Sequence, residues 1–205
     1  MDNKNPAPLP ALQPWRLLAS EDVLRERWCT LRRERYALAN GRIVEPYYVI
    51  EDYDWTHVFA IRDDGRIGVV RQYRPAAEVF CLELPGGIVD PGEDPLAAAQ
   101  RELREELGAT ARAWTTLRVT YPNPARQTNR VHLFVATGVT SDGIQTLDPN
   151  EEVTPLFLTE QEIRDAIRTG EFTQGLHIAS FFVALDHLRA LATTPPPTAA
   201  EAPQS

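Results

Sequence analysis

The stretch GGIVDPGEDPLAAAQRELREELGA, residues 86–109, limits the possible folds more than any other part of the chain. It begins with two glycines and ends in a segment whose apolar residues recur with the period of a helix. Asp94 is a favourable N-cap and Pro95 a favourable first residue, so these features predict a helix over 95–107. The apolar stripe of this helix, which must face a core, consists of Ala99, Leu103 and Leu107.

Three carboxylates, those of Glu102, Glu105 and Glu106, lie close together at the edge of that stripe. Like charges at such spacing destabilise an isolated helix by roughly 0.2–0.5 kcal/mol per pair. A divalent cation would offset the repulsion, because Mg²⁺ takes oxygen ligands and keeps positions for water and substrate phosphates. The alternative is a solvated acidic face that Arg101 and Arg104 neutralise.

The composition limits the partners of the chain. With 205 residues, 43% of them hydrophobic, it is long enough to bury a core. Its 29 acidic and 21 basic residues give a net charge of −8, which argues against binding to nucleic acid or to an anionic membrane. An anionic small molecule stays compatible with this charge, since a bound cation reverses the sign of a local acidic cluster.

The cysteines and the N-terminal segment predict the compartment. Cys29 and Cys81 lie far apart, which predicts two buried thiols in a reducing environment rather than a disulfide or zinc site. The first residues lack an apolar signal region, and no apolar run reaches membrane-spanning length. We therefore expect a soluble, cytoplasmic protein.

The chain divides by composition into four parts. Residues 1–14 and 193–205 are rich in proline, alanine and polar residues, so we expect mobile tails. Between them we expect a small β-subdomain over 15–50 and a larger domain over 51–192.

The pattern of the larger part is mixed. Asn40-Gly41 and Asp64-Gly65 are hairpin turn signals between runs with strand character. Further strands are expected in CLELPGG, RVHLFVATGV and EVTPLFLT, and further helices over 160–169 and 177–191. Because tight hairpins occur among strands that alternate with helices, we expect an α+β fold with a mixed sheet and an N-terminal antiparallel β-subdomain.

The glycines and charged residues of the opening stretch have a characteristic spacing. In order they are Gly87, five residues, Glu93, seven residues, Arg101-Glu102-Leu103, one residue, Glu105-Glu106, one residue and Gly108. This pattern resembles the signature of the Nudix hydrolases, from which only Ala109 departs, at a packing position where the family prefers Ile, Leu or Val. The resemblance implies an α/β/α sandwich around a mixed sheet, with 51–192 as the catalytic domain. Beside the complete pattern, the solvated acidic face becomes a minor alternative.

The resemblance also implies roles for the carboxylates. Glu102 and Glu106 match the principal ligands of Mg²⁺, for which Mn²⁺ is a possible substitute. Glu105 matches a residue that helps to hold a second ion or a water molecule, and the carbonyl of Gly86 a main-chain ligand. These residues would activate a water molecule against a diphosphate.

Behind the ligands, Glu93 matches the partner that fixes Arg101, as a buried orienting pair.

Two arginines before the signature are candidates for substrate binding. VRQYR and the following ELP resemble the ADP-ribose pyrophosphatase branch, which cleaves nucleoside diphosphate sugars. Arg71 and Arg74 would contact a phosphate or a ribose, since arginine is suited to bidentate phosphate recognition. The alternative is that both are surface strand arginines.

Two later loops resemble the same branch. Pro124 follows the signature at the usual spacing, and Gln127 and Arg130 would read polar groups of the substrate; an ordinary proline-rich loop is the alternative. Glu151 and Glu152 match a catalytic loop glutamate that acts as general base, and the choice between them stays open. An exposed loop charge is the alternative for each.

The N-terminal subdomain pairs with a second subunit in relatives, so the resemblance implies a homodimer. Trp28 and Tyr47 are candidates for stacking on the nucleobase. The alternative for Trp28 is that it fills the core of the subdomain. His132 lies in a run with strand character and is interpreted as a structural histidine, and neither His132 nor His177 is assigned a role in the site.

Taken together, the sequence predicts a metal-dependent pyrophosphohydrolase of a nucleoside diphosphate sugar, with ADP-ribose as first choice. The products would be a nucleoside monophosphate and a sugar phosphate. One alternative is hydrolysis of nucleoside triphosphates or dinucleoside polyphosphates. The other is a sensor that binds ADP-ribose without cleaving it.

Overall fold

The computed structural model describes residues 12–193, so most of both predicted tails lies outside the described residues. The chain forms two compact units. The first contains the residues up to Asp52 together with Asn123–Thr128, and the second contains Tyr53–Pro122 and the residues from Asn129 onward. Among residues 12–193, no helix combines the length and apolar character that crossing a membrane requires.

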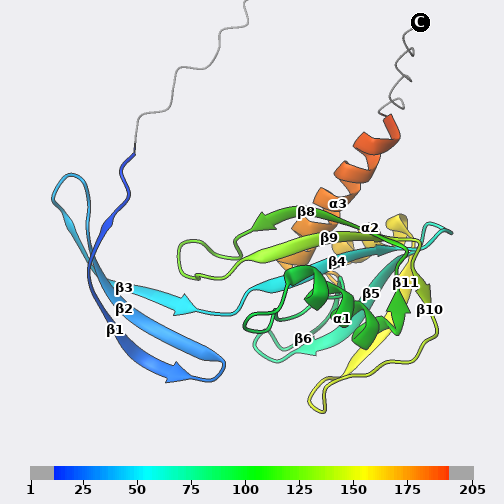
Figure 1. The fold of residues 1–205 in the computed structure, drawn as a ribbon, viewed down its shortest axis with the longest axis horizontal. Coiled ribbons are helices and arrows are strands. Elements are labelled where there is room, and N and C mark those ends of the chain that lie inside the picture. The colour runs from blue at the N-terminus through cyan, green and yellow to red at the C-terminus, as the bar shows by residue number, and fades with distance from the viewer. Residues whose placement is uncertain (1–11, 194–205) are drawn as a thin grey trace, which may run out of the picture. The chain divides into compact units, whose positions relative to one another are not determined.

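The first unit is an antiparallel sheet of three strands in the order β1-β2-β3 (Figure 1). Its strands are β1 (Arg16–Glu26), β2 (Cys29–Ala37) and β3 (Ile43–Glu51). The turn predicted at Asn40-Gly41 joins β2 to β3, with Gly41 at a φ of 82°, a left-handed conformation that favours glycine. The expected N-terminal β-subdomain is thus confirmed as a fold.

One cysteine prediction is wrong. Cys81 is buried, but Cys29 is exposed, because it lies directly after the tight turn between β1 and β2. A hairpin end has no second layer to cover it, which the alternation of residues along the strand does not reveal.

The second unit is built on a mixed sheet in the order β11-β5-β4-β9-β8, with β6 also paired to β5. Strands β4 and β9 run parallel, and the other pairs are antiparallel. A separate small sheet pairs β7 with β10. The strands are β4 (Trp55–Ile61), β5 (Ile67–Arg74), β6 (Val79–Glu83), β7 (Ala109–Thr110), β8 (Ala113–Thr120), β9 (Val131–Thr137), β10 (Thr140–Ser141) and β11 (Val153–Leu158).

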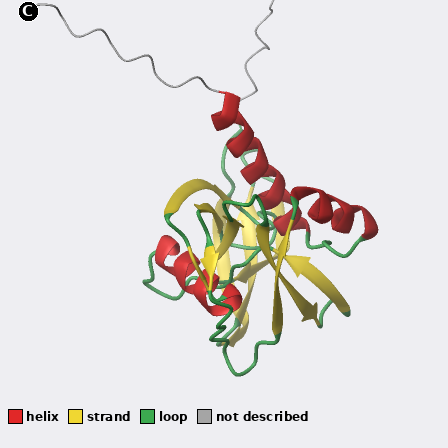
Figure 2. Cartoon of the chain, turned by 90° about the vertical axis from the view of Figure 1, so that its right-hand side faces the viewer, coloured by secondary structure: helices red, strands yellow, loops and turns green. Residues whose placement is uncertain are grey.

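Helices cover both faces of the mixed sheet, as Figure 2 shows. They are α1 (Pro95–Leu107), α2 (Glu160–Thr169) and α3 (Gly175–Thr193). Helix α1 contributes to one apolar core, which includes Val58 and Ala60 of β4, whereas Phe59 of the same strand joins α2 and α3 in the other core. The predicted α+β sandwich around a mixed sheet is confirmed.

Strand β8 has no counterpart in the sequence prediction. Its residues, AWTTLRVT, are exposed or half-buried throughout, because it is an edge strand that pairs with β9 alone. An edge strand lacks the clean alternation of apolar and polar residues on which a sequence pattern depends.

The first turn of α1 generates a stability prediction. The Asp94 carboxylate accepts hydrogen bonds from the amides of Leu96 and Ala97. We expect Asp94→Ala to lower the free energy of unfolding by about 1 kcal/mol, because these amides lose their acceptor. Asp94→Asn is the matched control and should stay close to wild type in urea denaturation. An equal loss in both variants would contradict the capping role.

Candidate active site

Two glycines allow the loop after β6 to lie against β4 and α1. Gly86 has a φ of 153°, and a Cβ atom there would lie 2.0 Å from the carbonyl oxygen of Thr56. A Cβ atom on Gly87 would lie 2.4 Å from Oε1 of Glu102. The Gly86 amide donates a hydrogen bond of 2.9 Å to Oε2 of Glu106. Glycine is therefore needed at both positions, at Gly86 because the backbone of β4 lies so close and at Gly87 because the Glu102 carboxylate does.

The carboxylates of Glu102 and Glu106 are withdrawn from water. Glu102 is 7% and Glu106 5% exposed, because the apolar stripe of α1 draws their side of the helix against the sheet. Burial raises the pKa of Glu102 to about 7. Burial also raises the pKa of Glu106 well above its usual range, against the opposing effect of the Gly86 amide. Nearby positive charge would therefore favour the anionic form of both groups at neutral pH.

Arg101 connects four groups of the loop and helix. Its Nε and Nη2 donate to the two oxygens of Glu93 at 3.1 and 3.2 Å, and Nη2 also donates to the carbonyl of Ile88 at 2.9 Å. Nη1 donates to Glu102 at 2.9 Å and to Glu105 at 3.0 Å. The Arg101–Glu93 pair is half-buried rather than buried, with side chains 33% and 19% exposed. The hydrogen bond from Arg101 lowers the pKa of Glu93.

The donor set suits a hard cation. Within residues 12–193, no group of three acidic, histidine or cysteine side chains already converges as a complete metal site. Glu102 and Glu106 nevertheless present carboxylate oxygens beside backbone that only glycine can bring so close. Oxygen ligands, with room for water and phosphate, are what Mg²⁺ takes in proteins. These residues fit a divalent cation.

One of the two loop glutamates, Glu151, acts electrostatically on the carboxylates of α1. The negative charge of Glu151 contributes to the raised pKa of both Glu102 and Glu106. Its own carboxylate accepts a hydrogen bond of 3.3 Å from the amide of Asp148. Glu151 is thus one of the charges that act on the two buried carboxylates.

Arg74 and Arg71 differ in their surroundings. The charge of Glu106 contributes to the raised pKa of Arg74, whose main cause is a hydrogen bond to Glu83. Arg71, an odd number of residues away on β5, points to the other face of the sheet and lies over the ring of Phe80 at 4.7 Å. The structure therefore brings Arg74, and not Arg71, to the carboxylates of α1.

Comparison with known proteins identifies this arrangement. Residues 55–176 match the family described as NUDIX domain. The chain belongs to the NUDIX domain family. Residues 15–50 also match the family described as nucleoside diphosphate sugar hydrolase N-terminal domain. The resemblance inferred from the signature is confirmed.

Individual Nudix relatives support the same grouping. The chain is 30% identical to the ADP-ribose pyrophosphatase of Bacillus subtilis (strain 168) over 155 residues, 75% of this chain and 82% of that protein. It is 36% identical to the ADP-ribose pyrophosphatase of Mycobacterium tuberculosis (strain ATCC 25618 / H37Rv) over 114 residues, 55% of each. A crystal structure of an ADP compounds hydrolase superposes with a TM-score of 0.77 at 23% identity, covering 90% of this chain and all of that one, and so shows the same fold.

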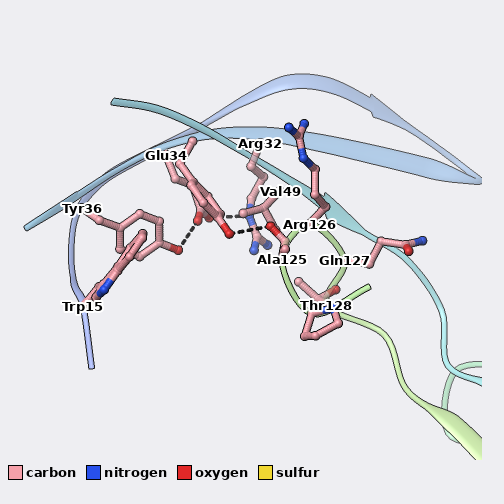
Figure 3. A pocket seen from close by; sticks show the side chains of 11 residues that line it. Trp15, Arg32, Glu34, Tyr36, Val49, Ala125, Arg126, Gln127 and Thr128 are labelled. Carbon is pink, nitrogen blue, oxygen red and sulfur yellow. Dashed lines mark hydrogen bonds and ion pairs between the residues drawn. The ribbon is translucent and has the colours of Figure 1, made fainter. Parts of the chain in front are cut away.

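Four of the predicted substrate-binding residues belong to the first unit of this Nudix protein. That unit contains a pocket of about 320 Å³, to which Tyr47, Pro124 and Gln127 contribute. Figure 3 labels Gln127 among the residues that line it. Trp28 is 58% exposed and has the guanidinium of Arg27 at 4.4 Å from its ring centre. The alternative that Trp28 fills the core of the subdomain is therefore wrong. The other lining residues are Trp15, Arg32, Glu34, Tyr36, Val49, Ala125, Arg126 and Thr128.

Arg130 and His132 lie in the second unit beside Asp54. The Arg130 amide donates to Oδ1 of Asp54 at 2.8 Å, and His132 Nε2 lies 3.0 Å from Oδ2. The interpretation of His132 as a structural histidine agrees with this contact.

Sequence reasoning missed a buried cluster around Glu83. This residue is fully buried, and Arg74 donates two hydrogen bonds to it. His177, buried on α3, has its Nε2 3.3 Å from the same carboxylate. A signal was available, because a glutamate inside the apolar run CLELP requires a partner. Nothing in the sequence indicated His177 as one of those partners.

The raised pKa values of the two α1 carboxylates generate a linkage prediction. A glutamate whose pKa is raised on folding, here from 4.5 to about 7 for Glu102, contributes its stability below the lower value and loses it as pH rises through the upper one. The metal-free protein should therefore lose stability between pH 5 and pH 8. A divalent cation binds the deprotonated form, so it should raise the melting temperature more at pH 8 than at pH 5.

Thermal melts with Mg²⁺ and with chelator at both pH values measure this difference. At saturating cation, about 100 times its Kd, the gain is roughly 2.7 kcal/mol. Glu106→Gln, which removes one carboxylate, should shrink the cation-dependent shift. A shift of the same size at both pH values would contradict the assignment.

Proposed function

We propose that this chain is a metal-dependent pyrophosphohydrolase of nucleoside diphosphate sugars, with ADP-ribose as the first substrate to test. The products are a nucleoside monophosphate and a sugar phosphate. The observation that carries the proposal is the pair of buried carboxylates, Glu102 and Glu106, held beside the Gly86 amide in a Nudix domain. The N-terminal family match and the names of the two bacterial relatives support the substrate class.

The carboxylates would hold the cation. Glu102, Glu106 and the carbonyl of Gly86 are the proposed ligands, and Glu105 assists as a further carboxylate. Mg²⁺ is the proposed cation, with Mn²⁺ as a substitute; when bound, it neutralises diphosphate charge and increases the acidity of water. Arg101, fixed by Glu93, holds Glu102 and Glu105 in place through its Nη1 donors.

The surrounding side chains would carry the remaining chemistry. Arg74 donates to a phosphate oxygen of the substrate, which stabilises charge that grows during cleavage. Glu151 accepts the proton of the attacking water, since an exposed loop carboxylate near the site is free to approach it. Arg71 contacts the ribose of the substrate, or it is a surface arginine of β5 without a role in binding.

The first unit is the proposed source of nucleobase recognition. Trp28 and Tyr47 would stack on the base, and Pro124 and Gln127 of the same unit would shape and read its polar edge. Arg130 of the second unit is a further proposed contact to polar groups of the substrate. A homodimer in the cytoplasm completes the proposal, with a small nucleotide as the partner and neither nucleic acid nor membrane.

A substrate panel tests the function directly. Purified protein is incubated with ADP-ribose, ADP-glucose, GDP-mannose, ATP and diadenosine polyphosphate, each with Mg²⁺ and with chelator, and the nucleotide products are separated and measured by anion-exchange chromatography. We expect turnover of ADP-ribose that chelator abolishes and that Glu106→Gln lowers by at least about 100-fold, since a ligand of the catalytic ion is lost. Turnover of ATP alone would move the assignment to nucleoside triphosphates, and tight ADP-ribose binding without turnover would indicate a sensor.

The two loop glutamates form a matched pair for a second test. Glu151→Gln should lower kcat roughly 100-fold, within the range that general bases contribute, because the acceptor for the water proton is removed. Glu152→Gln changes the same charge by the same amount one residue away and should keep kcat within about twofold. The reverse ranking would assign the role to Glu152.

A further inference from the structure

Arg74 is held from one side only. Its Nε and Nη2 donate to Oε1 and Oε2 of Glu83 at 2.9 and 2.6 Å, a side-on bidentate pair. A guanidinium has five N–H donors, so the opposite edge keeps donors for another acceptor. The Arg74 side chain is 47% exposed, whereas that of Glu83 is 1% exposed. The pair thus has a buried anchor and an accessible end.

Glu83 is anchored by more than Arg74. The amide of Gln72 donates to Oε2 at 3.2 Å, and the thiol of Cys81 donates to Oε1 at 3.0 Å. Gln72 and Arg74 are two residues apart on β5, as Cys81 and Glu83 are on β6. Residues at this spacing share a face of the strand, and the pairing of Gln72 with Cys81 puts all four on the same face. Each oxygen of Glu83 therefore receives donors that define its direction.

His177 contacts Glu83 from outside the sheet, and its tautomer follows from its contacts. The amide of Leu84 donates to Nδ1 at 3.1 Å, which leaves the ring proton on Nε2, 3.3 Å from Oε2 of Glu83. Burial, with the nearby charge of Arg74, lowers the pKa of His177 to about 3, so the ring is neutral. The neutral ring places its Nε2 beside the Glu83 carboxylate without competing with Arg74 for its charge.

A second histidine fixes the plane of this ring. His57 of β4 stacks on His177 with 3.9 Å between ring centres and 22° between planes. The Nδ1 of His57 lies 2.9 Å from Oγ of Ser180, one turn along α3 from His177. Burial lowers the pKa of His57 well below its usual range, so two neutral rings stack without charge repulsion.

We propose that Glu83 and His177 are positioning residues, which hold the Arg74 guanidinium so that its free edge binds a phosphate oxygen of the substrate. This inference rests on the proposed function, in which a diphosphate lies at Glu102 and Glu106. Without the donor on His177, the Glu83 carboxylate loses one of its restraints. Arg74 then keeps its charge but loses its fixed direction, and the phosphate loses a pre-oriented donor.

A double-mutant cycle between His177 and Arg74 tests the inference. His177→Met removes the ring donor at similar volume, His177→Gln keeps an N–H donor, and Arg74→Met removes the guanidinium. We expect His177→Met to raise KM for ADP-ribose roughly 10- to 100-fold, the range of a charge-assisted hydrogen bond, with a smaller change in kcat. His177→Gln should recover most of the loss. In the Arg74→Met background, His177→Met should change KM by less than about twofold, because its effect acts through Arg74.

Controls separate this outcome from general destabilisation and from failure of the proposed function. His187→Met alters another histidine of α3, outside the cluster, and should leave KM within about twofold. If His177→Met raises KM equally in both backgrounds, His177 is merely structural and the inference is overturned, while wild-type turnover keeps the function intact. If wild type binds ADP-ribose without turnover, calorimetric Kd replaces KM in the same cycle. If wild type neither binds nor cleaves the panel substrates, the proposed function fails, and this inference fails with it.

Discussion

The packing of α1 against the mixed sheet is the interaction on which the site depends. Ala99, Leu103 and Leu107 are buried against β4 and β5, and this contact sets the rotation of the helix about its axis. With the rotation set, Glu102 and Glu106 have to lie at the boundary between core and solvent, where their charges are poorly hydrated. The apolar stripe therefore creates the electrostatic demand that a cation can meet. The same side chains account for the stability of the fold and for the chemistry of the site.

Arg101 of α1 and Arg74 of β5 both act on the carboxylates of α1, and each is held in place by a glutamate. Arg101 is fixed by Glu93 and reaches Glu102 and Glu105 with its remaining nitrogen. Arg74 is fixed by Glu83, and the charge of Glu106 acts on it. In each case a glutamate outside the proposed ligand set holds part of the guanidinium fork and leaves the rest for the site. A rigid fork is suited to this use, because one edge can be anchored while another binds.

How much of this was predictable depends on the range of the interaction. The helix at 95–107 followed from its cap, its proline and its apolar period, which are all local. The hairpins at Gly41 and Gly65 followed from turn chemistry. Strand β8 was not predicted, since an exposed edge strand lacks a clear alternation of apolar and polar residues. The exposure of Cys29 was missed because burial depends on what covers a residue.

The site, too, contains residues that local sequence predicts and residues that depend on contacts between distant parts of the chain. The spacing from Gly87 to Gly108 indicated the carboxylate set, because those residues are neighbours in sequence as well as in space. The preference for Glu151 over Glu152 required knowing which loop residue acts on a helix more than 40 residues earlier, as the pKa contributions to Glu102 and Glu106 reveal. The contact between Glu83 and His177 joins residues 94 positions apart, and no local pattern predicts it.

The cluster around Glu83 is costly to keep in the sheet. A buried ion pair is often no more stabilising than apolar residues of the same volume, because desolvation offsets the attraction between the charges. Positions 72, 81 and 83 are on the α1 face of β5 and β6, beside a core where Val70 packs against Ala99 and Leu103. Apolar side chains there would fill the same space without four donors having to converge on one carboxylate. Fold stability alone therefore gives no reason for the cluster, whereas the fixed direction of an accessible guanidinium beside Glu106 does.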